Sequence, residues 1–509
     1  MRNPLRAAVV AAALVFAATG AAFAQVLQER IDLDAIQRIR QEGFERSQIE
    51  PLMRHLTDVI GPRLSYSPAH RRADEWAAGK LREWGLVDVA HEPIDAIGRA
   101  WEPLSYSGRI IAPYVQALHA EPTAWTGSTK GRIEGDVTLL DVESPDELEA
   151  YRGKLEGAIV MLGRPGSFPL RPLPPARADA DSILAQPRAA AGAPSPEQRR
   201  QQYEQAMQRW REERARAEAV ADFIAGENVA AVLRPSERAY GNIRVGGSRA
   251  GRDPGRPVPP PELIVAHEQY AQMYRNIKAG VPVRVELDVR NRFPRTDGRT
   301  YNTVGRIPGS DLADEFVVIG AHIDSWHAGT GATDNAAGVV VMMEAVRILR
   351  TLGLQPRRSI IIGLWTGEEL GYLGSRAWLE RHRDLHPRIS AYLNLDNGAG
   401  RIRGIYSQEN AAAAPILEQL LASFPDLGVV DVRHARTGGT DHEAFDAEGI
   451  PGFQFIQDPL DYMTHTHHTF SDRFERIIPD DLKQAAVIVA SMAYHLANRD
   501  EPLPRKPAA

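Results

Sequence analysis

Phe316-Val-Val-Ile-Gly-Ala-His-Ile-Asp324 is an apolar run that ends in polar residues. A run of this kind, without alternation, is typical of a strand that is covered on both faces, as in a parallel sheet. Similar runs occur at residues 360–365, 391–395 and 452–456. Helical patterns lie between or after them, at residues 339–350, 411–424 and 482–496. This order predicts an α/β fold in which helices sandwich a mixed, mainly parallel sheet.

Polar side chains follow the ends of these strands. His322 and Asp324 are two residues apart on an extended segment, so they face the same way and Asp324 can accept a hydrogen bond from the His322 ring. Asp334 follows in a turn bounded by Gly331 and Gly338, and a later strand ends at Asp396. Because sheets of this kind place their chemistry beyond the carboxyl ends of the strands, these loops are where a site is expected.

Two adjacent carboxylates, Glu368 and Glu369, follow the strand at residues 360–365. Holding them together after a buried strand is costly unless a cation or a proton lies beside them. The economical arrangement uses one as a metal ligand and its neighbour as a proton shuttle. A late loop adds His467 and His468 as further candidate ligands.

The ligand count predicts a pair of metal ions. Two histidines and three carboxylates, one of them able to bridge, suit two ions about 3.5–4 Å apart. The chain contains no cysteine, so any metal must be held by histidine and carboxylate. This mixture favours zinc over magnesium or calcium, with cobalt and manganese as alternatives.

The motifs around these residues resemble those of the co-catalytic zinc exopeptidases. That family includes bacterial leucyl aminopeptidases and carboxypeptidase Q, also called plasma glutamate carboxypeptidase, and the chain most resembles the carboxypeptidase Q branch. The motifs that carry the resemblance are His322-Ile-Asp-Ser-Trp326, Gly331-Ala-Thr-Asp-Asn-Ala-Ala-Gly338, Leu364-Trp-Thr-Gly-Glu-Glu369, Asp396 and His468-Thr-Phe-Ser-Asp472.

The resemblance implies a ligand set for two zinc ions per chain. It implies that one ion is bound by His322, Asp334 and Asp396. It implies that the other is bound by Asp334, Glu369 and His468. Asp334 would therefore bridge the two ions.

The resemblance also implies catalytic roles for two carboxylates. Glu368 would be the general base, and Asp324 would hold the ring of His322. Asp441 and His442 lie in a further family motif and are candidates for contacts with the substrate. A structural role for His442 is an equally good interpretation.

The N-terminus carries the pattern of a secretory signal. Arg2 and Arg6 precede an apolar run at residues 7–23, which ends in Ala22-Phe23-Ala24. This predicts a signal peptide over residues 1–24 and an exported protein, periplasmic or secreted. No later segment is apolar for 18 residues, so no membrane span is expected after the signal is removed.

A strand-rich region, residues 110–280, interrupts the α/β pattern and resembles the protease-associated domain that many family members carry as an insertion. Within it, residues 164–196 are rich in proline, alanine and arginine, which is typical of a mobile loop. Residues 25–109 and 281–509 are then expected to form the catalytic peptidase domain. The inserted region is expected to gate the site or to help form a homodimer, without supplying a metal ligand.

Composition excludes some classes of function. The 509 residues include 60 basic and 66 acidic side chains, which is not the basic excess that nucleic-acid binding needs. The predicted activity is hydrolysis of dipeptides or short peptides by a metal-bridged water, as an aminopeptidase or a carboxypeptidase Q-like dipeptidase. Two alternatives share the fold: glutaminyl cyclase-like acyl transfer, usually with one zinc, and a receptor-like protein without metals. The intact five-ligand set disfavours both.

Overall fold

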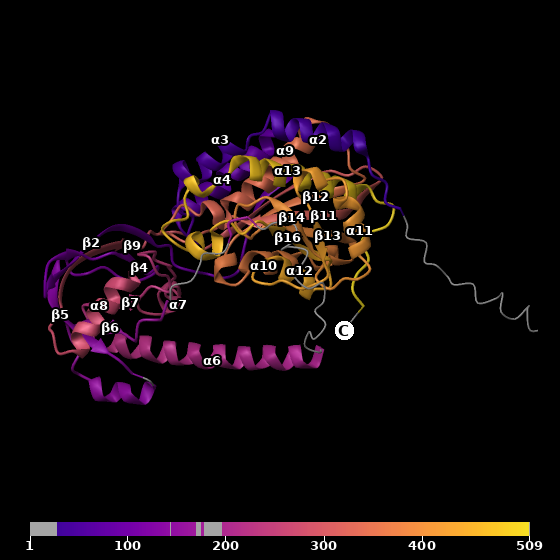
Figure 1. Cartoon of the computed structure of the whole chain (residues 1–509). Coiled ribbons are helices and arrows are strands. Elements are labelled where there is room, and N and C mark those ends of the chain that lie inside the picture. Colours follow the sequence, from indigo (N-terminus) through magenta and orange to yellow (C-terminus); the bar gives the residue numbers. More distant parts are fainter. Residues whose placement is uncertain (1–27, 143, 169–174, 178–195, 508–509) are drawn as a thin grey trace, which may run out of the picture.

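The computed structural model describes residues 28–142, 144–168, 175–177 and 196–507, which form two domains (Figure 1). The predicted signal peptide, residues 1–24, lies outside the described residues, as does most of the predicted loop 164–196. Along the described parts of the chain, no helix is both long and apolar enough to cross a membrane.

The larger domain is built on an eight-stranded sheet. Its strand order is β1 (Val87–Pro93), β10 (Tyr301–Ile307), β12 (Arg358–Trp365), β11 (Leu312–His322), β13 (Ile389–Asn394), β16 (Gly452–Gln457), β14 (Ile402–Tyr406) and β15 (Asp431–Arg433). The four central strands β12, β11, β13 and β16 run parallel. They correspond to the four continuous apolar runs, and the predicted α/β fold with a mixed, mainly parallel sheet is confirmed.

Helices cover both faces of this sheet (Figure 1). One face packs against α2 (Leu33–Glu45), α3 (Ile49–Arg54), α4 (Pro68–Glu83), α9 (Ala337–Thr351), α11 (Ala414–Leu421) and α13 (Pro479–Asn498). The other face packs against α10 (Leu373–Arg381) and α12 (His442–Ala447). Short helical turns complete the domain: η2 (His55–Ile60), η4 (Ala332–Ala336), η5 (Glu368–Leu370), η6 (Arg383–Arg388), η7 (Pro425–Leu427), η8 (Tyr462–Thr466) and η9 (Phe474–Arg476).

The second domain, here called the insertion, extends over residues 102–292. Its sheet has the order β3 (Gln116–Ala117), β2 (Glu102–Ala112), β9 (Arg284–Arg292), β5 (Ile133–Leu140), β6 (Ile159–Leu162), β7 (Ala231–Pro235), β8 (Glu262–Val265) and β4 (Ala120–Pro122). Its helices are η3 (Pro145–Tyr151), α6 (Pro196–Gly226), α7 (Arg249–Arg252) and α8 (His267–Lys278). The predicted boundary at residue 110 falls inside β2 and the one at residue 280 falls before β9, so the insertion is wider than predicted.

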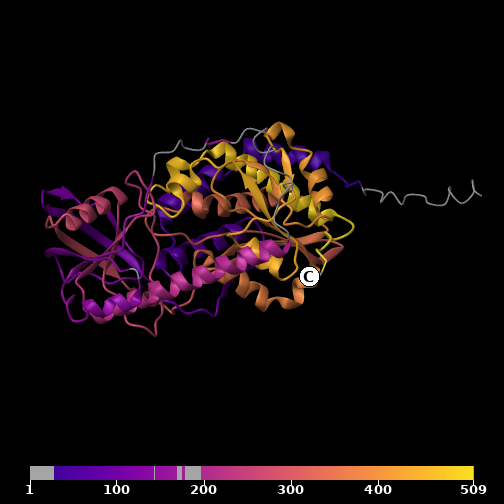
Figure 2. The same cartoon turned by 60° about the horizontal axis from the view of Figure 1, so that its bottom comes forward.

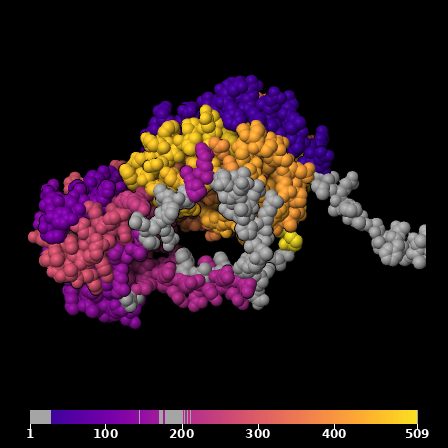
Figure 3. Space-filling model, in the orientation of Figure 1, coloured from indigo at the N-terminus to yellow at the C-terminus, as the bar shows by residue number. Residues whose placement is uncertain are grey.

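The long helix α6 reaches from the insertion along the larger domain, as two views of the molecule show (Figures 1 and 2). It extends over 31 residues, and near its C-terminal end Ile224 packs into the core of the insertion. The space-filling view shows an opening between α6 and the larger domain (Figure 3). The helix therefore forms one border of a hollow whose other border is the larger domain.

Candidate metal centre

Strand pairing brings the predicted ligands to one edge of the larger sheet. His322 is the last residue of β11 and lies opposite Trp365, the last residue of β12, three residues before Glu368. Asp396 follows β13, the other neighbour of β11. Three adjacent parallel strands thus deliver a histidine and carboxylates to the same edge, as the sequence predicts.

One cluster of ligands forms around His322. The Nε2 atom of His322 lies 3.3 Å from Asp334 Oδ1 and 3.4 Å from Asp396 Oδ1. All three residues are buried, and their ligand atoms lie close enough together to share one ion. The structure therefore brings together the three residues predicted for the first metal.

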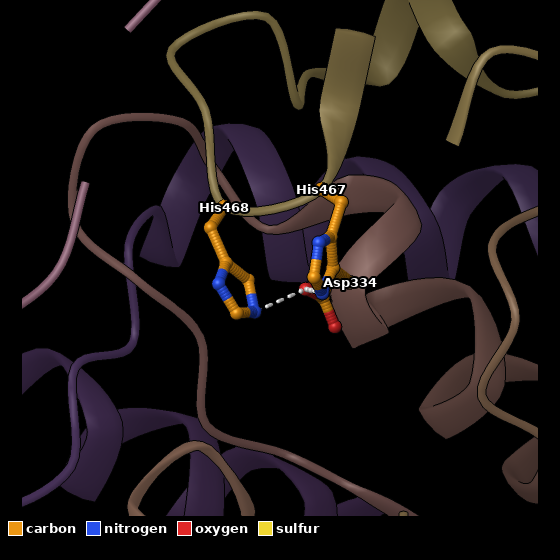
Figure 4. Close-up of side chains that lie close together, drawn as sticks. All are labelled: Asp334, His467 and His468. Carbon is orange, nitrogen blue, oxygen red and sulfur yellow. Dashed lines mark ion pairs between the residues drawn. The ribbon is translucent and has the colours of Figure 1, made fainter. Parts of the chain in front are cut away.

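A second cluster forms on the other side of Asp334. His468 Nε2 lies 2.9 Å from Glu369 Oε2. The same nitrogen lies 3.2 Å from Asp334 Oδ2, which is the ion pair drawn in Figure 4. His467 Nε2 is 4.0 Å from the same Asp334 oxygen, and the two histidine rings have centroids 3.8 Å apart. His467 is therefore a second candidate ligand beside His468. Asp334 presents one carboxylate oxygen to each cluster, as a bridging ligand would.

Three carboxylate oxygens in these clusters are buried without a hydrogen-bond donor among the described residues. They are Asp334 Oδ2, Glu369 Oε1 and Asp396 Oδ1. Buried polar atoms nearly always have a partner, and a bound cation would provide one. Oxygen and imidazole donors without thiolate suit zinc. The residues present therefore fit a pair of divalent ions.

Burial and charge shift the acidity of the site. Burial lowers the pKa of His468, but the Glu369 and Asp334 carboxylates outweigh it and hold that pKa at about 10. Burial raises the pKa of Glu368 well above its ordinary range, and the nearby Asp396 and Asp441 carboxylates act in the same direction. Glu368, 3.9 Å from His322 Nε2, is thus suited to hold a proton beside the clusters.

Asp324 connects the first ligand to the loop of Glu368. Its Oδ1 accepts a hydrogen bond from the Glu368 backbone N–H at 3.2 Å, and its Oδ2 accepts one from Ser65 Oγ at 2.7 Å. His322 Nδ1 is 3.5 Å from Asp324 Oδ1 but 3.0 Å from the Asp324 backbone oxygen. The Asp324 backbone oxygen and Oδ1 both favour a proton on His322 Nδ1. That tautomer leaves His322 Nε2 free to bind a metal.

Arg63 supports the loops of the site, a role that its sequence context does not reveal. It is completely buried, and it donates hydrogen bonds to the backbone oxygens of Gly61, Ile323, Thr330 and Gly331, at distances from 2.7 to 3.1 Å. The guanidinium thus ties the loop after β11 to the N-terminal helices. The only hint in the sequence of this role is that a charged residue directly follows the turn Gly61-Pro62.

The turn that carries Asp334 is held by close packing and by a second carboxylate. Gly331 has a φ of 59°, and a Cβ there would lie 2.4 Å from the Ser325 Cβ. Asp472 accepts hydrogen bonds from the Thr333 backbone N–H (2.6 Å), the Thr333 hydroxyl (2.8 Å) and the Asp334 backbone N–H (3.1 Å). These contacts fix the position of the bridging carboxylate.

The two predicted substrate contacts are both buried. Asp441 accepts a hydrogen bond from Ser375 Oγ at 2.5 Å, while its Oδ2 has no donor among the described residues. Burial raises the pKa of Asp441 to about 7. His442 Nε2 lies 3.0 Å from the Thr437 backbone oxygen, which is a structural role. His442 Nδ1, like Asp441 Oδ2, is buried without a partner among the described residues.

A segment of the insertion packs directly on the loop of His468. The Val245 backbone N–H donates to the His468 oxygen at 2.9 Å, and Asn242 Nδ2 donates to the His465 oxygen at 2.6 Å. Arg244 Nη2 lies 3.3 Å from His468 Nδ1. The insertion is thus part of the wall behind the second cluster.

Comparison with known proteins identifies the larger domain. Residues 302–493 match the model of peptidase family M28. This part of the chain is a family M28 peptidase domain. The match confirms the predicted family and the predicted enzyme class, a metallopeptidase of the zinc exopeptidase type.

Similar curated proteins match this chain over nearly its whole length. Carboxypeptidase Q of Bos taurus is 26% identical and covers 95% of this chain and 91% of its own. Human carboxypeptidase Q is 25% identical, and the match covers 93% of this chain and 89% of the human protein.

Solved structures show that the fold of both domains is shared. A peptidase M28 precursor from Shewanella amazonensis has a TM-score of 0.68 at 24% identity and covers 93% of this chain and 99% of its own. A zinc aminopeptidase from Bacillus subtilis has a TM-score of 0.57 at 18% identity, with 89% and 95% covered.

Proposed function

We propose that this M28 peptidase is an exported di-zinc exopeptidase that hydrolyses dipeptides or short peptides. The observation that carries the proposal is Asp334, whose two oxygens face two different histidines, while carboxylate oxygens beside it have no donor in the described part of the chain. His322, Asp334 and Asp396 would hold one zinc ion. Asp334, Glu369 and His468 would hold the other. When bound there, zinc supplies Lewis-acid polarisation of water and of the peptide carbonyl.

Glu368 is the general base and general acid in this proposal. It lies beside both clusters without being needed in either ligand set, and its raised pKa suits a group that takes up and releases a proton. Its carboxylate accepts the proton of the attacking water and delivers it to the nitrogen of the leaving amine. Asp324 acts as a positioning residue, because it fixes both His322 and the Glu368 backbone.

Short peptides are the proposed substrates. The similar proteins include carboxypeptidase Q and a zinc aminopeptidase. The insertion packs against the loop of His468, where it restricts room for a long chain. The export proposal rests on the signal pattern in residues 1–24. The possible homodimer and the protease-associated nature of the insertion stay predictions.

Two measurements test the proposal. Metal analysis of protein purified without chelator should approach two zinc ions per chain, whereas one ion with full activity would favour the cyclase-like arrangement. Digestion of one peptide series in free, N-acetylated and C-amidated forms then shows which terminus is recognised. Cleavage inside long chains, with blocked and free termini cut equally, would contradict an exopeptidase.

A further inference from the structure

The insertion contains a large cavity that the proposed mechanism does not use. Its volume is about 950 Å³, which is the size of a site for an organic ligand. It lies between the C-terminal half of α6 and the strands β7 and β8, and none of the five proposed ligands lines it. Its apolar lining is formed by Leu162, Ala217, Ala221, Ile224, Val232 and Ile264.

Six charged side chains of the cavity form three ion pairs, whereas Arg249, Arg252 and Asp253 form none with the described residues. Arg234 pairs with Glu262 at 2.8 Å, and Arg256 pairs with Asp222. Arg252 is half-buried, and no carboxylate of the described residues lies within ion-pair distance of its guanidinium. Burial lowers the pKa of Arg252, which reflects the cost of keeping that charge out of water.

Aromatic side chains connect this arginine to the metal centre. The guanidinium carbon of Arg252 is 5.9 Å from the ring centroid of Trp125. Trp125 contacts Trp326 with centroids 6.2 Å apart, and Trp326 lies 5.9 Å from the His468 ring. These ring contacts connect the Arg252 side of the cavity to the His468 side of the metal centre.

We propose that this cavity is a second peptide-binding site, in which Arg252 binds the free carboxylate terminus of a short apolar peptide. This inference rests on the proposed function, because it takes the ligand to be a substrate or product of the metal centre. A carboxylate is the natural partner of an unpaired guanidinium, and the apolar lining suits leucine-like side chains. The site would retain such peptides close to the metals.

A peptide fits the cavity better than another organic anion, such as a fatty acid. Besides its apolar residues, the lining carries polar groups from Thr123, Thr126 and Ser248, together with three ion pairs. The three hydroxyl oxygens already make hydrogen bonds with Glu262, the Thr123 backbone oxygen and the Gly251 backbone N–H. Each keeps further hydrogen-bonding capacity, which peptide N–H and C=O groups can use and an alkyl chain cannot.

The test measures binding to wild-type holoenzyme in which leucine hydroxamate, a zinc chelator, occupies the metal centre. The probe is N-acetyl-Leu-Leu with a free carboxylate, compared with its C-terminal amide by calorimetry. We expect one carboxylate probe per chain, and at least tenfold weaker binding for the amide. Arg252→Gln should weaken the carboxylate probe at least tenfold and leave the amide unchanged. Arg109→Gln is the control, because Arg109 lies on β2, outside the lining of the cavity, and is paired with Glu286.

Equal binding of the probe to wild type and Arg252→Gln would overturn the proposal, as would equal binding of acid and amide. Laurate serves as a fatty-acid probe. If laurate binds in a manner that depends on Arg252 and the peptide does not bind, a peptide is the wrong ligand. Arg252→Lys, which keeps the charge, provides a second variant if Arg252→Gln does not fold. The proposed peptidase activity is tested separately, by measuring peptide turnover in the enzyme without hydroxamate. Absence of turnover there would contradict the proposed function and leave the binding result unaffected.

Discussion

The two sheets of this protein share a parallel arrangement but differ in the state of their carboxylates. In the insertion, β5, β6, β7 and β8 run parallel, and Asp141 follows the end of β5. Asp141 is paired with Arg164 at 2.9 Å, Tyr274 at 3.1 Å and Lys278 at 3.5 Å. At the edge of the larger sheet, Asp334 and Asp396 each have an oxygen that no described residue reaches with a hydrogen-bond donor. Parallel strands therefore bring carboxylates to one edge of a sheet in both domains. Only carboxylates whose oxygens lack hydrogen-bond donors, as in the larger domain, suit a metal site there.

The strongest test of this comparison replaces one carboxylate in each sheet. Asp334→Asn should abolish binding of both metals and reduce turnover below detection, because this residue belongs to both clusters. Asp141→Asn should change neither quantity, because Asp141 already has three partners. Metal analysis and peptide turnover check both. Full zinc content in Asp334→Asn would show that Asp334 is not needed to bind the metals.

A second test separates proton transfer from metal binding. Glu368→Gln should lower kcat by about 10²–10⁴-fold, the usual contribution of a general base, while both metals are retained. Glu369→Gln is the matched variant at the adjacent position and should instead weaken zinc binding. Loss of zinc from Glu368→Gln, with retention in Glu369→Gln, would show that the two roles are reversed.

A third test concerns the support of the larger sheet's edge. Arg63→Met should cost about 3–5 kcal/mol of unfolding free energy, because four backbone oxygens lose a buried donor. Denaturant unfolding measures this loss. Arg292→Met, an exposed arginine of the insertion paired with Glu102, should change stability by less than about 1 kcal/mol. Similar losses in both variants would contradict the assigned role.

The smallest effect is expected at Glu121, a partly buried carboxylate on β4 of the insertion. Burial raises its pKa to about 7, although Arg473 acts against the shift. The folded state therefore binds the proton more tightly, and stability falls as pH rises from about 4.5 to about 7. Glu121→Gln should be about 1–2 kcal/mol more stable than wild type at pH 8 and similar at pH 4. Thermal unfolding at both pH values measures this, and an unchanged difference would contradict it.

Part of the fold could be predicted because fully buried strands leave a local signal. The runs that became β11, β12, β13 and β16 are continuous and apolar, and each was placed within a few residues. The strand β2 was not predicted, since its exposed positions carry polar residues and its apolar pattern is weak. The boundaries of the insertion were therefore set too narrowly.

The sequence by itself determined the kinds of ligand and their approximate place. The chain lacks cysteine, and polar residues stand at the ends of successive strands. Both facts can be read from the sequence, which is why it already indicated the ligands His322, Asp334, Glu369, Asp396 and His468. Their chemical roles came from the resemblance to a family.

Tertiary structure alone revealed which groups support the site and which lack partners. Arg63 reaches carbonyl oxygens about 260 residues away, and Arg244 contacts His468 across 224 residues. The unpaired state of Arg252 depends likewise on what surrounds it in three dimensions. The physical reason is that periodicity records how one segment is buried, whereas hydrogen bonds and ion pairs depend on how distant segments approach one another.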